Sequence, residues 1–165
     1  MKSLSQVDNR RCLLISLWVV GLDQLAKWWI VRTLPAFEVR PLLPHLNLVF
    51  LHNTGAAFSL FRHAPPETFI VLAGLASLGI LAWFWRYRRG QLLLACSFAL
   101  ILGGAVGNAI DRIARGYVVD FVDFYVGSWH FAAFNVADSA ISVGAALLLL
   151  EVLLQRPPPV PPGRS

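Results

Sequence analysis

Residues 91–110 read QLLLACSFALILGGAVGNAI and contain no charged side chain. An α-helix rises about 1.5 Å per residue, so a helix of this length spans about 30 Å, the thickness of the hydrocarbon core of a bilayer. A helix on the surface of a soluble domain keeps one charged or polar face toward water, and this stretch has no charged face. The stretch therefore predicts a transmembrane helix.

Three further apolar runs flank this stretch, at about 12–31, 68–85 and 134–154. The run at 68–85 is also uncharged, whereas the first run has Asp23 and Lys27 near its far end. The first run lacks the small-residue cleavage pattern of a signal peptide, so we expect it to be retained. We predict an α-helical integral membrane protein with four transmembrane helices in a single domain, residues 1–165.

The composition agrees with a protein that lies in a bilayer. Of 165 residues, 57% are hydrophobic and only 14% are charged, and the mean hydropathy is +0.63. The formal net charge is +5, but the basic side chains stand at the ends of apolar runs and not on a polar domain. This placement is typical of membrane proteins and argues against nucleic acid as a partner.

Lysine and arginine in the short flanks of the spans predict the orientation. Arg86, Arg88 and Arg89 crowd the turn between the second and third spans, on the side that also holds both termini if there are four spans. That side is expected to be cytoplasmic, with a proline-rich tail at 157–165. The longer segments 32–67 and 111–133 then face the outer side. The basic residues of the two termini are Lys2, Arg10, Arg11, Arg156 and Arg164.

The first outer segment contains a weak strand pattern. Leu46, Leu48 and Phe50 alternate with their neighbours, and Asn53-Thr54-Gly55 is a turn signal. Residues 56–61 continue as a mostly apolar run. We expect a short β-hairpin here, lying on the outer membrane surface.

Ionisable side chains inside spans are costly to bury and are therefore candidate functional residues. Asp23 and Lys27 stand four residues apart, which fits a self-neutralising ion pair as well as a place beside a functional site. Asn108, Asp111 and Arg112 share one helical face at the outer end of the third span. They fit either a site or the ordinary chemistry of a helix end.

Aspartates stand on both sides of the connection to the fourth span. Asp120 and Asp123 lie in an apolar, aromatic stretch, and Asp138 lies three residues after Asn135 in the first turns of the span. Two carboxyl groups held close together share a proton, so one acts as base and the other as acid in peptide hydrolysis. Asp120 and Asp138 are the pair that could converge. The alternatives are a solvated loop acid at Asp123 and a helix N-terminal carboxylate at Asp138.

Other chemistries have less support. The four histidines are scattered without zinc-binding spacing, and the serines lack a base at helical spacing. Cys12 and Cys96 are far apart in sequence and fit small buried hydrophobes. We expect no metal and no cofactor. A small transporter or proton-conducting subunit is an alternative function, because intramembrane carboxylates also serve proton relays, and a non-catalytic assembly partner is another.

Five motifs together resemble the lipoprotein signal peptidase (signal peptidase II) family of intramembrane aspartic endopeptidases. The resemblance covers most of the chain, and the motifs occur in the family's order. They are Asp23-Gln24-x-x-Lys27, Asn53-Thr54-Gly55-Ala56-Ala57-Phe58-Ser59, Gly107-Asn108-x-x-Asp111-Arg112, Gly116-x-Val118-Val119-Asp120-Phe121 and Phe134-Asn135-x-Ala137-Asp138.

The resemblance implies that Asp120 and Asp138 form a catalytic dyad, and that Lys27 and Asp111 are structural. The implied substrate is a prolipoprotein whose cysteine carries diacylglycerol, cut on the N-terminal side of that cysteine. Membrane lipid is the other implied partner, no metal is implied, and we expect a monomer. The resemblance also implies the bacterial cytoplasmic (inner) membrane, with the active site facing the periplasm. The residues implied to bind substrate or support the site are Asp23, Asn53, Gly55, Asn108, Arg112 and Asn135.

Three expectations concern how the substrate is held. The first outer segment is expected to form a β-like cradle over it. The family often has a proline before Phe134, where this chain has Ala132-Ala133, so we expect a looser entry into the fourth span. The Gly103-x-x-x-Gly107 spacing predicts close helix packing, and the face around Gly104 is a hypothetical path for the signal-peptide helix.

Overall fold

The computed structural model describes residues 8–55 and 65–154. Two parts of the sequence predictions lie outside these residues. One is the second half of the Asn-Thr-Gly motif, residues 56–59, with the run that follows it. The other is the proline-rich tail, residues 157–165.

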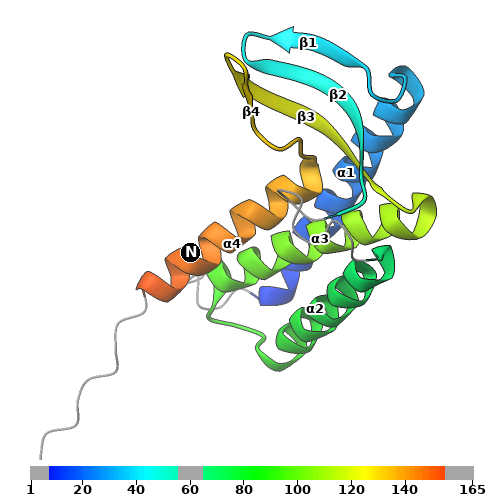
Figure 1. Cartoon of the computed structure of the whole chain (residues 1–165). Coiled ribbons are helices and arrows are strands. Elements are labelled where there is room, and N and C mark those ends of the chain that lie inside the picture. Colours follow the sequence, from blue (N-terminus) through cyan, green and yellow to red (C-terminus); the bar gives the residue numbers. More distant parts are fainter. Residues whose placement is uncertain (1–7, 56–64, 155–165) are drawn as a thin grey trace, which may run out of the picture.

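Four helices form a bundle, and each is long and apolar enough to cross a membrane (Figure 1). Four long apolar helices were predicted, and four are found in the described residues, at about the expected places. The third helix is five residues longer at its outer end than expected, because Asp111 and Arg112 continue it until Gly116, in the left-handed conformation (φ 78°), ends it. The helices are α1 (Leu13–Thr33, after a 3-10 turn at Asn9–Cys12), α2 (Pro66–Arg86), α3 (Leu92–Arg115) and α4 (Val136–Leu154).

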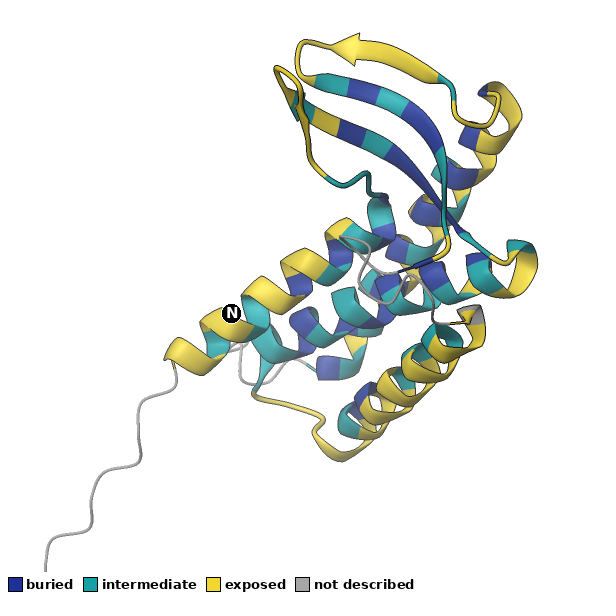
Figure 2. Ribbon diagram, viewed as in Figure 1, coloured by how far each residue is buried: buried dark blue, intermediate teal, exposed yellow. Residues whose placement is uncertain are grey.

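The bundle presents a lipid-facing exterior. Large apolar side chains on the outer faces of the helices are more than half exposed, and they would make the protein insoluble in water (Figure 2). In a bilayer the same side chains lie among lipid tails at no cost. Examples are Leu17, Trp18, Leu25, Leu75, Leu78 and Leu153.

Helix α3 packs against the other three helices, and its glycines permit close approach. A Cβ at Gly103 would lie 2.8 Å from Cβ of Val19 in α1, and one at Gly104 would strike the carbonyl oxygen of Ala137 in α4. The prediction of close packing is therefore confirmed. The hypothesis that the face around Gly104 admits a substrate helix is wrong, because α4 already occupies that face.

An antiparallel sheet covers one end of the bundle (Figure 1). Its strands pair in the order β1 (Val39–Leu43), β2 (Leu46–Asn53), β3 (Val118–Val126) and β4 (Trp129–His130). The predicted strand at 46–51 is confirmed as part of β2, and it does form a hairpin. Within the described residues its partners are β1 on one side and β3 on the other, so the hairpin turn lies before Leu46 and not at Asn53–Gly55.

The sheet is joined to the helices by a small apolar core and by backbone hydrogen bonds. Ile30 of α1 and Leu34, which caps that helix, pack against Phe50 of β2 and Val119 of β3. At the start of α4, the amide of Phe134 donates to the carbonyl of Val122 (3.0 Å), and its own carbonyl accepts from the amide of Val122 (2.9 Å). The expectation of a loose entry into the fourth span is wrong, because these bonds hold the entry without a proline.

Candidate active site

Asp120 lies in β3 and is buried where the sheet meets the helices. Its two carboxylate oxygens accept hydrogen bonds from two amide side chains. The Nδ2 of Asn135 donates to Oδ1 (2.7 Å), and the Nδ2 of Asn53, at the end of β2, donates to Oδ2 (2.8 Å). Asn53 also accepts from the amide of Gly55 (3.0 Å), so the Asn-Thr-Gly turn holds the side chain that contacts Asp120.

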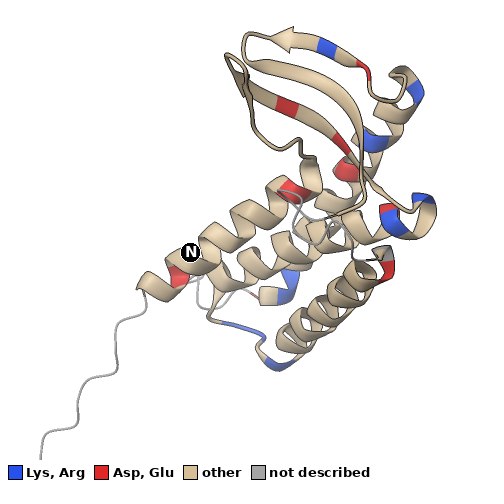
Figure 3. Ribbon diagram, in the orientation of Figure 1, with Lys and Arg blue, Asp and Glu red and all other residues tan. Residues whose placement is uncertain are grey.

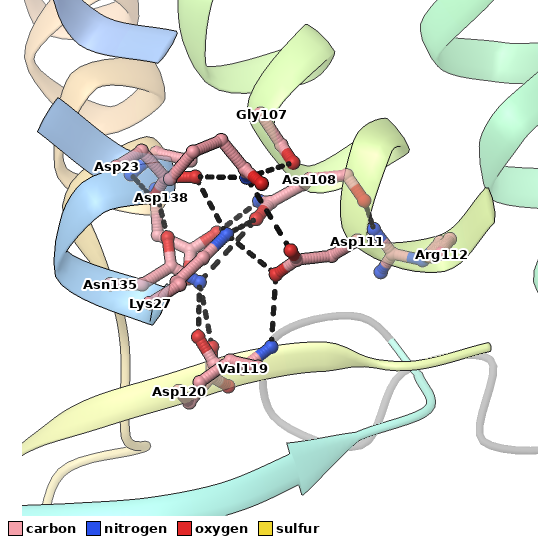
Figure 4. A network of polar contacts seen from close by, with 12 residues as sticks. Asp23, Lys27, Gly107, Asn108, Asp111, Arg112, Val119, Asp120, Asn135 and Asp138 are labelled. Carbon is pink, nitrogen blue, oxygen red and sulfur yellow. Dashed lines mark hydrogen bonds and ion pairs between the residues drawn. The ribbon is translucent and has the colours of Figure 1, made fainter. Parts of the chain in front are cut away.

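Asp138 lies one turn into α4, and Asn135 caps that helix. Oδ1 of Asn135 accepts from the amide of Asp138 (2.9 Å), as an N-cap residue does. Oδ1 of Asp138 in turn accepts from Nδ2 of Asn108 in α3 (2.7 Å). One asparagine therefore contacts both acids, with its amide nitrogen on Asp120 and its oxygen on the backbone of Asp138 (Figure 4). This geometry supports the expectation that Asp120 and Asp138 converge.

Lys27 is completely buried beside the two acids. Its ammonium group has three protons and three acceptors: Oδ2 of Asp23 (2.8 Å), Oδ2 of Asp111 (2.9 Å) and Oδ1 of Asn108 (3.0 Å). By occupying the oxygen of Asn108, it leaves the amide nitrogen of Asn108 to donate to Asp138. Lys27 thus orients a side chain that contacts the candidate dyad.

The two partners of Lys27 hold the backbone on either side of the site. Oδ1 of Asp23 accepts from the amide of Ala137, in the first turn of α4 (2.9 Å). Oδ2 of Asp111 accepts from the amide of Val119, immediately before Asp120 (3.1 Å). The ion cluster therefore ties together α1, α3, β3 and α4, and it places both candidate acids (Figure 4).

Arg112 lies at the edge of the site toward α2. Its Nη2 donates to the carbonyl of Gly55 (3.0 Å), and its guanidinium lies over the ring of Phe69 at 4.7 Å. Arg112 therefore holds the end of the Asn-Thr-Gly turn and places a positive charge near both acids.

The acids of the described site outnumber its cations by one. Four acids face three cations, so the cluster is neutral when one carboxyl group is protonated, and a neutral cluster costs least to bury. The acids are Asp23, Asp111, Asp120 and Asp138, and the cations are Lys27, Arg112 and Arg115.

The pKa of Asp120 identifies one place for that proton. Burial and then the charge of Asp138 raise the pKa of Asp120 from 3.8 to about 7, although the amides of Asn53 and Asn135 and the charge of Lys27 oppose the shift. Near neutral pH the pair can thus hold a single shared proton, which is the state that acid–base hydrolysis requires.

All ten predicted site residues belong to one connected region. Asp23 and Lys27 do not form an isolated ion pair, because Lys27 also pairs with Asp111. The three residues form a buried charged triad. The interpretation of Asp123 as a solvated acid is wrong: it is buried in β3, where it accepts from Nδ2 of Asn47 (2.8 Å) and lies 2.9 Å from Nδ1 of His130.

Sequence reasoning missed two contributors. Nε2 of Gln24 donates to Asp23 (3.1 Å) and to the carbonyl of Gly107 (3.1 Å), so it links α1 to α3. Arg115, which was given no role from the sequence, pairs with Asp111. The i, i+4 spacing of Asp111 and Arg115 was the available signal for this pair, and the place of Gln24 in the first motif was the signal for Gln24.

Comparison with known proteins places the chain among bacterial membrane enzymes. The model of the family described as signal peptidase (SPase) II, peptidase A8, matches residues 15–154. The lipoprotein signal peptidase of Alteromonas mediterranea is 42% identical over 155 residues, covering 92% of this chain and 85% of that protein. That of Syntrophotalea carbinolica is 46% identical over 144 residues, covering 86% and 89%.

Two solved structures are also similar, and both are described as bacterial membrane enzymes determined by the in meso method. One gives a TM-score of 0.79 at 30% identity and covers 87% of each chain. The other gives a TM-score of 0.80 at 27% identity and covers 93% of this chain and 99% of that one. The helices and the sheet together therefore form a known arrangement.

Proposed function

The chain belongs to the signal peptidase II family, whose members remove signal peptides from prolipoproteins, and we propose that Asp120 and Asp138 are its catalytic pair. The single observation that carries the proposal is the position of Asn135, which contacts Asp120 through its nitrogen and the backbone of Asp138 through its oxygen. A buried acid and a half-buried acid held this way, with one proton between them, are equipped for hydrolysis by an activated water.

The proposed reaction needs no group other than the two acids and a water. The ionised carboxylate takes a proton from water as its oxygen attacks the scissile carbonyl carbon. The protonated carboxyl group gives its proton to the carbonyl oxygen. When the tetrahedral intermediate collapses, the C–N bond breaks and the nitrogen of the leaving chain takes the proton that the first carboxylate received from water. One hydroxyl of the intermediate returns its proton to the other carboxylate, which restores the pair. The hydroxyl and hydrogen of one water are thus divided between the two products.

The proposed substrate is a prolipoprotein with diacylglycerol on its cysteine, cut on the N-terminal side of that cysteine. Acyl chains in the outer leaflet would hold the scissile bond at the depth of the sheet end of the bundle, where Asp120 and Asp138 lie, and this restraint favours reaction. The supporting roles of Asp23, Asn53, Gly55, Asn108, Arg112 and Asn135 are those of the contacts described above.

We place the sheet and the active site on the periplasmic side. The amide of Asn9 donates to the carbonyl of Arg88 (2.7 Å), which brings Arg10 and Arg11 to the same end of the bundle as Arg86 and Arg88, opposite the sheet (Figure 3). A short turn rich in arginine is retained in the cytoplasm. The orientation requires that a membrane-impermeant thiol reagent, applied to intact spheroplasts, labels a cysteine introduced at Trp129. It is wrong if a cysteine at Arg89 is labelled instead.

The test of function is cleavage by purified protein in detergent. We expect the wild type to cut a diacylglyceryl-modified prolipoprotein, to leave the unmodified precursor uncut, and to be indifferent to a metal chelator. Absence of cleavage with a competent modified substrate would overturn the proposal.

The pH dependence of the cleavage rate tests the shared proton. As pH rises through the pKa of Asp120, about 7, the pair loses its proton, so the rate should fall about tenfold per pH unit above that value. Loss of the Asn53 amide, which favours the ionised form, should move this fall to higher pH in Asn53→Ala. Asn47→Ala, on the same strand but bonded to Asp123, is the matched control and should leave the profile in place. A flat profile to pH 9 would contradict the shared proton.

A further inference from the structure

A cavity of about 480 Å³ lies beside Asp138, along the first turns of α4. The cavity is lined by two segments. One is the segment that leads into the helix, with Phe131, Ala132 and Phe134, and the other is the helix itself from Asp138 to Val143. Among the described residues that line it, almost all of the surface is apolar, and Asp138 alone is charged. The cavity therefore extends the candidate active site with an apolar subsite.

The cavity runs from the acid toward the interior of the membrane. Asp138 and Val143 are five residues apart, which is about 7.5 Å along a helix. Val143 is 52% exposed, and Leu150, seven residues further on the same helical face, is 44% exposed. The far end of the cavity thus opens onto the lipid-facing side of α4, so a flexible chain can pass from the cavity into the bilayer.

The size and lining favour an alkyl chain over a peptide side chain. The cavity has roughly three times the volume of a 150 Å³ apolar cavity that admits benzene. A peptide backbone placed there would lack partners for its polar groups, because the lining offers few hydrogen-bonding atoms. An alkyl chain makes no such demand, and it can continue out of the open end.

We propose that this cavity binds one acyl chain of the substrate's lipid and thereby sets the scissile bond beside Asp138. The inference rests on the proposed function, since only a lipid attached next to the scissile bond would link the two. Lipid tails are as apolar as the cavity, so the chain gains little transfer energy by entering. The gain is in positioning, because a chain held in the cavity restrains the peptide bond at the depth of the acids.

Two tryptophan substitutions in neighbouring alanines test this proposal. Ala132 lines the cavity, whereas Ala133 is of the same type and similar burial but does not. For substrates carrying dipalmitoyl or dibutanoyl glycerol, Ala132→Trp should lower the long-chain to short-chain ratio of kcat/KM about tenfold, because the indole displaces the long chain. Ala133→Trp should keep the wild-type ratio. Ser142→Trp fills the cavity from the helix side and gives an independent variant.

An unchanged ratio in both Ala132→Trp and Ser142→Trp would overturn the proposal. So would a loss that follows the size of the peptide side chains beside the scissile bond and not the length of the acyl chain, because the cavity would then belong to the peptide.

Photocrosslinking separates this inference from the proposed function and from binding of bulk lipid. A diazirine on the substrate's acyl chain should label residues 131–143 in Asp120→Asn protein, and excess phospholipid should not prevent it. Labelling without cleavage by the wild type would leave the cavity in place and refute the peptidase. Cleavage without labelling there, or equal labelling by a diazirine phospholipid that the substrate does not displace, would refute the acyl-chain site.

Discussion

Purified Asp138→Asn protein is expected to cleave a lipid-modified prolipoprotein at least about 10³-fold more slowly than the wild type, and Asp120→Asn is expected to be similarly inactive. An asparagine keeps the size of the side chain but can neither accept a proton from water nor donate one to the leaving group. Each acid serves in both halves of the reaction, so losing either one removes acid–base catalysis as a whole.

The structure supplies a control of the same chemistry. Asp123 is the second buried acid of β3, the strand of Asp120, but its partners are Asn47 and His130, which do not contact Asp120. Asp123→Asn should therefore retain activity within a few-fold of the wild type. Circular dichroism and thermal unfolding of all three variants would show that they are folded. Equal loss in all three, or continued cleavage by both Asp120→Asn and Asp138→Asn, would contradict the assignment of the dyad.

Replacement of Lys27 by methionine is expected to lower the free energy of unfolding by about 3–5 kcal/mol, the usual cost of removing one partner from a buried ion pair. The ammonium is fully buried and contacts Asp23, Asp111 and Asn108, so its removal leaves two buried carboxylates without the cation that they share. Cleavage should fall as well, because the amides of Ala137 and Val119 are held by those same carboxylates.

Arg32→Met is the matched control for Lys27→Met. Arg32 lies in the last turn of the same helix, but it is exposed and its guanidinium rests on the ring of Trp28 at 4.6 Å. Its loss should cost about 1 kcal/mol or less. Thermal or denaturant unfolding in detergent measures both. The double variant Lys27→Met/Asp111→Asn should regain part of the stability, since it removes one uncompensated charge. If Lys27→Met were as stable as Arg32→Met, the cluster would not have the role that its geometry indicates.

The four spans could be read from the sequence because their cause is local. A membrane span must bond its own backbone and present apolar side chains over about 20 residues, and both requirements appear as a continuous apolar run. The order of the polar motifs could be read in the same way. Asn108, Asp111 and Arg112 share a helical face by spacing alone, and α3 indeed carries them together.

The sheet was only partly predictable because strand pairing is not local. The alternation at 46–51 predicted a strand, but its partner β3 lies about 70 residues later in a stretch that carries two aspartates and shows no clear alternation. Those aspartates are buried because Asn47, Asn53 and Asn135, from other elements, satisfy them. From the sequence alone, a carboxylate in a short connecting segment is expected to be exposed to solvent. Its burial can be inferred only when its hydrogen-bond donors from other elements are known.

The sequence alone determined that the chain has four helices apolar enough to cross a membrane, and its motifs indicated which acids to examine, since hydropathy and helical spacing are properties of neighbouring residues. Only the tertiary structure decided that Asn135 caps α4 and contacts Asp120, that Lys27 joins two carboxylates, and that an apolar cavity reaches Asp138. These features depend on the distance between atoms far apart in the chain, and that distance is set by how α1, α3, α4 and β3 pack.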